Sequence, residues 1–242
     1  MDEFRIITKE RNEILLVETL NEELRKYRLP GAMSWMANTD LGKMFFHHFA
    51  GKGYDIWFSN YLMKQDTILM GKSDRSVLEL HTHFTNSFES IWNGFNEEGR
   101  FDREYGLTYV SDVDTTGKFR KGLQYDTFDI HFHKEMLQPY VSYSPKLMTF
   151  LENVEKGKAV RLSNIVTLLT LDMENCIRAI LSYACHEGLA ERFLNGRVEE
   201  LLIHLVYHLS LLDKLPEPDP DQVRKAGEVY KIIISDSRSM TV

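Results

Sequence analysis

Short runs of aromatic and β-branched residues, separated by turn residues, fill the chain from about residue 41 to residue 132. Three of them are the segments 54–63, 76–84 and 126–132, and turn sequences such as Gly51-Lys52-Gly53 stand between such runs. Runs of this length between turn signals are typical of strands in an all-β barrel or sandwich. The first half of the chain is therefore predicted to be a β-domain.

Apolar residues alternate with polar ones inside two of these runs, and the alternation assigns faces, because successive side chains of a strand point to opposite sides. The apolar faces consist of Leu78, Leu80 and Phe84 in one run and of Phe128, Ile130 and Phe132 in the other. We expect these faces to point into the core. The pairs His81/His83 and His131/His133 fall on the opposite faces, which we expect to point away from it.

From residue 144 onward the apolar residues recur at helical spacing. Ser144 followed by Pro145 offers an N-cap with proline in the first helical position, and Gly157 is available to end that helix. A second helix is predicted from about Asp172 to about Gly188, a third over 189–212, and a fourth over 220–234 after the proline-rich linker 215–220.

Charge and cysteine content limit the possible functions. The 242 residues include 36 acidic and 29 basic side chains, a net charge of −7, which argues against a surface that itself follows nucleic-acid phosphates. No leader-like or membrane-spanning apolar run is present, so a cytoplasmic protein is expected. Cys176 and Cys185 lack metal-ligand or disulfide-framework spacing and are predicted to be reduced core thiols.

Catalytic signatures are weak. No G-x-S-x-G motif occurs, and Cys185 and His186 are neighbours in helical sequence, where adjacent side chains point about 100° apart and do not form a dyad. His204 and His208 lie one helical turn apart on the polar shoulder of the third helix, which favours solvent or dimer contact over metal binding. We therefore predict no catalytic residue, no bound metal and no cofactor.

The histidine pairs leave one alternative open. A cupin-type barrel can bind a divalent metal through an H-x-H pair, a carboxylate and a further histidine. The corresponding set in this sequence is His81, His83, Glu89 and either His131 or His133. The alternation places these histidines on the face away from the expected interior, so the metal-dependent cupin enzyme is kept as the second reading.

The stretch from residue 125 to residue 234 resembles the regulatory region of AraC-type transcription regulators, in particular the PchR-like subgroup. The matching pieces follow one another in order as the strand 128–133, the helix 144–154, the helix opening 171–173, and the segments 188–194, 197–202 and 223–232. The order, the spacing and the change from strands to helices together make the resemblance specific.

The resemblance implies an α+β protein with a cupin-like β-barrel or sandwich followed by a packed bundle of about four helices. It divides the chain into an amino-terminal arm (1–40), an effector-binding barrel (41–135), a helical dimerisation and linker subdomain (136–235) and the truncated start of a DNA-binding domain (236–242). The helix-turn-helix reader is expected to be missing, so DNA would be contacted only through that absent domain. A stand-alone binding protein without a reader is a further alternative.

The resemblance also implies a small-molecule effector and a homodimer. Taking core-facing residues with a flat ring or a polar group as the pocket, we predict that the effector contacts Trp35, Phe58, Asn60, Thr82, Phe84 and Trp92. Each of them can equally be a core-filling residue. For the dimer, we predict contacts through Tyr207, His208 and Leu211 on the third helix.

Overall fold

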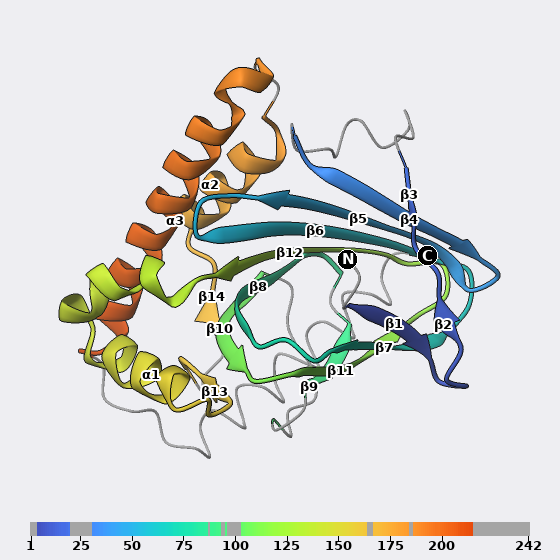
Figure 1. Cartoon of the computed structure of the whole chain (residues 1–242), viewed down its shortest axis with the longest axis horizontal. Helices are drawn as coiled ribbons and strands as arrows, with labels where there is room; N and C mark the ends of the chain where they lie inside the picture. The colour runs from blue at the N-terminus through green and yellow to red at the C-terminus, as the bar shows by residue number, and fades with distance from the viewer. Residues whose placement is uncertain are drawn as a thin grey trace, which may run out of the picture.

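Two antiparallel β-sheets and a layer of helices make up the protein, whose computed structural model describes residues 4–19, 31–86, 88–92, 95, 103–163, 167–183 and 186–214 (Figure 1). The smaller sheet has the strand order β2-β1-β7-β11-β9. Its strands are β1 (Arg5–Thr8), β2 (Glu13–Ile14), β7 (Thr67–Ser73), β9 (Glu89–Trp92) and β11 (Val113–Phe119).

The larger sheet has nine strands in the order β13-β10-β8-β12-β6-β5-β4-β3, with β14 also paired to β10. Its strands are β3 (Val17–Glu18), β4 (Met33–Thr39), β5 (Gly42–Ala50), β6 (Tyr54–Met63), β8 (Val77–Thr85), β10 (Glu104–Val110), β12 (Gln124–Phe132), β13 (Val160–Arg161) and β14 (Thr167–Leu168). Its central strands β8, β12, β6 and β5 pair antiparallel over most of their lengths.

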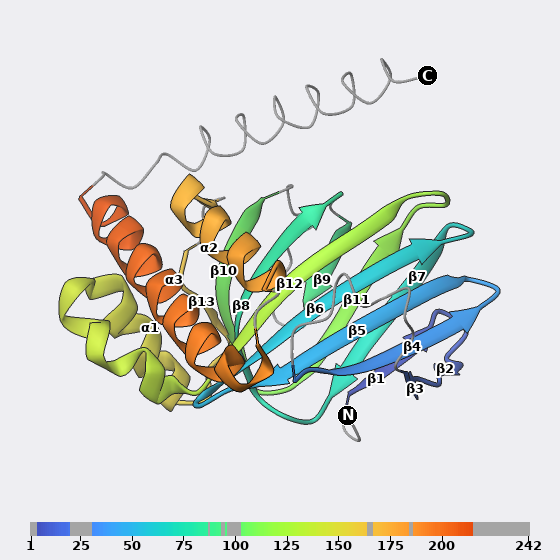
Figure 2. The same cartoon turned by 90° about the horizontal axis from the view of Figure 1, so that it is seen from above.

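The helices lie at one end of the molecule and pack against the outer face of part of the larger sheet, beside β8, β10 and β12 (Figure 2). They are α1 (Pro145–Glu155), α2 (Leu171–Leu181) and α3 (Ala190–Leu212), with short 3-10 helices η2 (Lys134–Met136), η3 (Gln138–Tyr143) and η4 (Glu187–Leu189) beside them. The predicted cap is confirmed, since Ser144 Oγ accepts a hydrogen bond from the Leu147 amide at 3.3 Å. Gly157 follows α1 with a φ of 66°, a left-handed conformation that glycine adopts without steric cost.

Two apolar clusters lie on the two faces of the larger sheet. The cluster between this sheet and the helices contains Leu80, Ile130, Leu147 and Leu201, all at most 1 % exposed. A second cluster, which includes Met44, Phe46, Leu69 and Phe119, lies between the two sheets. The strands β8 and β12 therefore lie in the middle layer of the molecule and are buried on both faces over most of their lengths.

The predicted α+β class, a cupin-like barrel or sandwich followed by packed helices, is confirmed by this arrangement. The second helix ends at Leu181, earlier than predicted, and Tyr183 beyond it donates a hydrogen bond to the His186 carbonyl. Residues 5–18 and 33–39, which belong to the segment 1–40 that was expected to form an arm, supply β1 to β4 to the two sheets. The predicted fourth helix and the segment 236–242 lie outside the described residues.

The predicted facing of the strands needs one correction. The face with Leu78, Leu80 and Ile130 is buried, as expected, but it packs against the helices. The opposite face of β8 and β12 is turned toward the smaller sheet, so the prediction that His81 and His83 point away from the interior was wrong. Alternation tells which residues share a face, but in a three-layer protein both faces of the middle sheet are interior.

Candidate functional site

Strand register brings a row of polar side chains together on the inner face of the larger sheet. Trp57 of β6 pairs with Asp129 of β12, and Asp129 pairs on its other side with His81 of β8. His131, two residues further along β12, pairs with Glu79 of β8. Since directly paired residues on adjacent antiparallel strands have their side chains on the same face, this register alone puts two carboxylates and two imidazoles next to one another.

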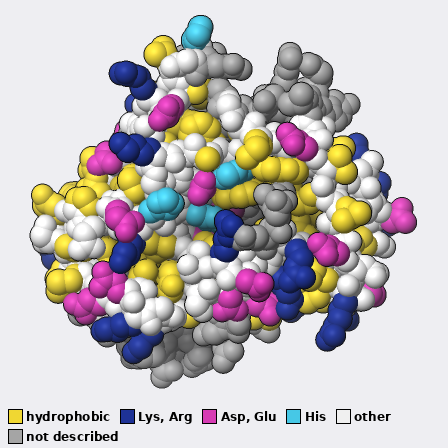
Figure 3. All heavy atoms as spheres, in the orientation of Figure 1, with side chains coloured by type: hydrophobic (Ala, Val, Ile, Leu, Met, Phe, Trp, Pro, Cys, Tyr) yellow, Lys and Arg dark blue, Asp and Glu magenta, His cyan; other side chains and the backbone are white. Residues whose placement is uncertain are grey.

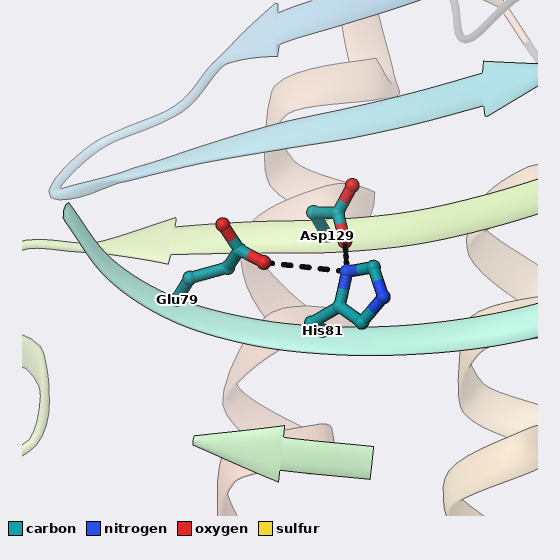
Figure 4. A group of neighbouring side chains, drawn as sticks. All are labelled: Glu79, His81 and Asp129. Carbon is teal, nitrogen blue, oxygen red and sulfur yellow. Dashed lines mark hydrogen bonds and ion pairs between the residues drawn. The ribbon is translucent and has the colours of Figure 1, made fainter. Parts of the chain in front are cut away.

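Glu79, His81 and Asp129 form the centre of this group (Figure 4). His81 Nδ1 and Asp129 Oδ1 form a short hydrogen bond, and His81 Nδ1 lies 3.3 Å from Glu79 Oε1. One ligand atom from each of the three side chains lies within 4.8 Å of the other two. Glu79 is 7 % and His81 8 % exposed, so the group is shielded from bulk water.

Neighbouring side chains hold the far ends of these three residues. His131 Nε2 lies 3.4 Å from Glu79 Oε2, and His83 Nε2 lies 3.1 Å from His81 Nε2. Thr127 Oγ1 donates to Asp129 Oδ2 at 3.3 Å. The group is thus a connected polar network inside the protein rather than a set of isolated side chains.

Burial and pairing shift the pKa values of the network in different directions. Burial opposes ionisation of Glu79, but hydrogen bonds from His131 and His81 outweigh it and hold the pKa of the Glu79 carboxyl below its usual range. Burial, with the charge of Glu79 as a smaller contribution, raises the pKa of Asp129. Burial also opposes protonation of His131, yet its pairing with Glu79 raises its pKa. The network is therefore built around an ionised Glu79.

The network lines a cavity of about 680 Å³ between the sheets. Aromatic rings make up much of its wall, namely Phe4, Phe46, Trp57, Tyr61, Phe88, Trp92 and Phe132. His48, which stacks on Trp57 with ring centroids 4.3 Å apart, and Asp55, which accepts a hydrogen bond from His48 at 2.9 Å, extend the polar part. Figure 3 shows histidine and acidic side chains gathered near the middle of the face that is viewed in Figure 1.

Of the six residues predicted to contact the effector, Trp92 lines this cavity. Trp35 is buried in the apolar cluster between the sheets, 6.0 Å from the Trp57 ring. Asn60 is buried and donates a short hydrogen bond to Asp126. Neither belongs to the cavity wall.

The other three predicted effector residues lie on the helix side of the sheet. Phe58 and Phe84 pack in the cluster under the helices, and the Thr82 hydroxyl donates to the Glu104 carbonyl at 2.9 Å. They were assigned to the pocket because the apolar faces of these strands were expected to point into the barrel. In the structure those faces pack against the helices. The cavity is lined instead by the alternate residues of the same strands.

The inner residues Trp57, Glu79 and Asp129 were missed at the sequence level. A signal for them exists: the polar faces of the segments 54–63, 76–84 and 126–132 contain no lysine and no arginine. Strand faces that meet water usually include such residues. A polar face made of histidine, carboxylate, serine, threonine and aromatic residues indicates an internal wall.

The alternative metal set is only partly brought together. His81 and His83 meet on the inner face, and His131 and His133 line the cavity. Glu89 lies elsewhere, with its side chain 48 % exposed and 2.8 Å from Lys118 Nζ. The carboxylates next to His81 are those of Glu79 and Asp129, and not that of Glu89, which the sequence spacing had suggested.

On α3, the residues predicted to form the dimer differ in their surroundings. Tyr207 is 63 % and Leu211 40 % exposed, and Ile203, one turn earlier, is 52 % exposed. These three form an apolar stripe on the outer face of the helix. His208 is half-buried and its Nδ1 lies 3.0 Å from the Tyr105 hydroxyl of β10, so its side chain contacts the β-domain.

No protein-family model and no curated protein matches the sequence. Among solved structures, the chain is similar to the crystal structure of the AraC-like transcriptional activator CuxR, with a TM-score of 0.43 and 11 % sequence identity over 85 % of this chain and 72 % of that chain. A likeness this distant carries no argument about family or activity. Within the described part of the chain, no helix is long and apolar enough to cross a bilayer.

Proposed function

We propose that this chain is the effector-sensing and dimerisation region of an AraC-type transcription regulator. The observation that carries the proposal is the cavity of about 680 Å³ on one face of a sheet whose other face is packed against α1, α2 and α3. The sequence resemblance over residues 125–234 supports the same assignment. We propose a regulatory rather than an enzymatic role, in the cytoplasm.

The cavity suits a small organic molecule. Its volume lies within the range of about 300–1,000 Å³ that is usual for ligand pockets, and such pockets combine apolar walls with a few polar groups. Trp57 and Trp92 offer flat surfaces for stacking, and Ser59 and Thr115 offer hydroxyls. These features favour an effector with an aromatic or ring-shaped part and several hydrogen-bonding groups.

The middle sheet offers a route from the cavity to the helices. On β8, His81 lines the cavity while Leu80, the preceding residue, is buried under the helices. An effector that favours one position of this strand therefore also favours one packing of the helices, since the cluster beneath them is close-packed. Differential affinity for two such arrangements is what would drive the switch.

The exposed stripe of Ile203, Tyr207 and Leu211 supports a homodimer with α3 in the interface. DNA would be contacted by a helix-turn-helix domain encoded after Val242. A thermal-shift screen with siderophores, sugars and aromatic metabolites tests effector binding, because a ligand at 100 times its Kd stabilises the folded state by about 2.7 kcal/mol. The coding sequence beyond Val242 tests the regulator assignment, which a continuation without a helix-turn-helix segment would contradict.

A further inference from the structure

We propose that Glu79, His81 and Asp129 form a binding site for one divalent first-row transition-metal ion on the wall of the cavity. The proposal stands on the geometry of these side chains and does not depend on the regulatory function. It goes beyond effector binding, because it assigns a defined inorganic ligand to a defined part of the cavity.

Three potential ligand atoms converge at this place. They are Glu79 Oε1, His81 Nδ1 and Asp129 Oδ1, and the three side chains present ligand atoms within 4.8 Å of one another. Ligands at about 2.0–2.2 Å from a zinc-sized ion in tetrahedral or octahedral geometry are separated by about 3–4 Å. The separation of 3.3 Å between Glu79 Oε1 and His81 Nδ1 already lies in that range.

The second polar atom of each side chain, which points away from the three ligand atoms, contacts a neighbouring residue. Glu79 Oε2 faces His131 Nε2 at 3.4 Å, and Asp129 Oδ2 accepts a hydrogen bond from Thr127 at 3.3 Å. His81 Nε2 faces His83 Nε2 at 3.1 Å, a contact that is satisfied when His81 carries its proton on Nε2 and leaves the Nδ1 lone pair for a metal. Such outer contacts are what orient metal ligands in proteins.

Charge favours a cation here. Glu79 and Asp129 are both largely buried, with side chains 9 % and 13 % exposed. Buried carboxylates are stable when they are paired, hydrogen-bonded or coordinated to a metal. A divalent ion between Glu79 and Asp129 would balance the charge of both carboxylates at once.

The donor set indicates the kind of metal. One imidazole nitrogen and two carboxylate oxygens suit Zn²⁺, Mn²⁺, Fe²⁺ or Ni²⁺ and contain none of the thiolates that Cu⁺ prefers. Three protein ligands leave at least one coordination position unfilled in these ions. Since all three residues line the cavity, that position would face the space between the sheets.

The test is metal titration of the whole chain after treatment with a chelator, followed by calorimetry with Zn²⁺ and Mn²⁺ separately. The proposal predicts one ion per chain and at least tenfold weaker binding in Asp129→Asn and Glu79→Gln. Glu89→Gln is the matched control, because Glu89 is an exposed carboxylate paired with Lys118 on the smaller sheet. The metal affinity of this variant is expected to equal that of the wild type.

A fourth variant keeps the test valid if a ligand substitution unfolds the protein. Thr127→Val removes the hydrogen bond to Asp129 Oδ2 but leaves every ligand in place, and second-layer changes of this kind weaken metal binding by about 10–100-fold. Binding below a tenth of an equivalent in the wild type, or equal affinity in Thr127→Val, Asp129→Asn and Glu89→Gln, would overturn the proposal. Either result would leave the outcome of the effector screen unaffected, because that screen measures binding of organic compounds to the cavity.

Discussion

Adjacent residues on β8 and β12 have opposite surroundings. Leu80 is 1 % exposed under the helices, while His81 next to it lines the cavity, and Ile130 and His131 repeat the same pattern on β12. A single step along either strand therefore crosses from an apolar core to a polar network. The consequence is that substitutions on the two faces of one strand should affect different properties.

Leu80→Ala tests the apolar face. Because the side chain is fully enclosed between sheet and helices, truncation should lower the free energy of unfolding by about 2–5 kcal/mol. Leu62→Ala on β6 is the control, because Leu62 is 40 % exposed and its truncation should change stability by about 0.5 kcal/mol or less. Urea denaturation measures both, and equal losses would contradict the assignment of faces.

At the scale of elements, α3 is attached to the β-domain by apolar packing and by hydrogen bonds, among them Tyr54 to Asn195 at 2.7 Å and Tyr105 to His208 at 3.0 Å. Leu194, Val198, Leu201 and Leu205 are completely buried along its inner side. Burial raises the pKa of the Tyr105 phenol, so the hydroxyl stays protonated and donates to His208 Nδ1. This hydrogen bond requires a neutral His208.

The contact predicts a pH dependence of folding. Burial lowers the pKa of His208 below 6.5, so the unfolded chain binds the proton more tightly. The stabilisation is therefore complete above pH 6.5 and is lost as the pH falls through the lower pKa of the folded state. Melting curves between pH 7.5 and pH 5 should show a smaller loss of stability in His208→Gln than in the wild type. Identical pH profiles for the two proteins would show that His208 does not contribute to the pH dependence of stability.

The elements were largely predictable because local signals specify them. The Ser144 cap, the proline at 145 and the apolar spacing over 189–212 gave the starts and faces of α1 and α3. The candidate site was not predictable in the same way, because Glu79, His81 and Asp129 meet only through the register of β8 against β12. Which element packs against each face of a strand depends on the tertiary structure, and the sequence of one strand alone does not specify it.

At the scale of the whole molecule, the middle sheet separates the cavity from the helices, and the outer side of α3 carries an exposed apolar stripe. The proposed function places a ligand on one side of this arrangement and a second copy of the chain on the other. The two sides can be altered independently, because the stripe and the cavity wall share no residue.

Tyr207→Glu tests the proposed dimer. A carboxylate in the centre of the stripe would be desolvated without a partner in a dimer interface, so the variant should shift sedimentation from dimer toward monomer. Met148→Glu on α1 is the control, since Met148 is also exposed, at 47 %, but lies outside the stripe. A wild-type chain that is monomeric at high concentration, or a dimer that Tyr207→Glu does not weaken, would contradict the prediction.

The central claim is that the space between the sheets is the effector site. The most direct test measures ligand affinity in a variant whose cavity is partly filled by a larger side chain. Ser59→Leu adds side-chain volume to the cavity wall, while Ser111→Leu adds the same volume at an exposed turn between β10 and β11. For any compound that stabilises the wild type, we predict at least tenfold weaker binding to Ser59→Leu and unchanged binding to Ser111→Leu. Equal affinity for both variants would place the compound outside the cavity and contradict the account.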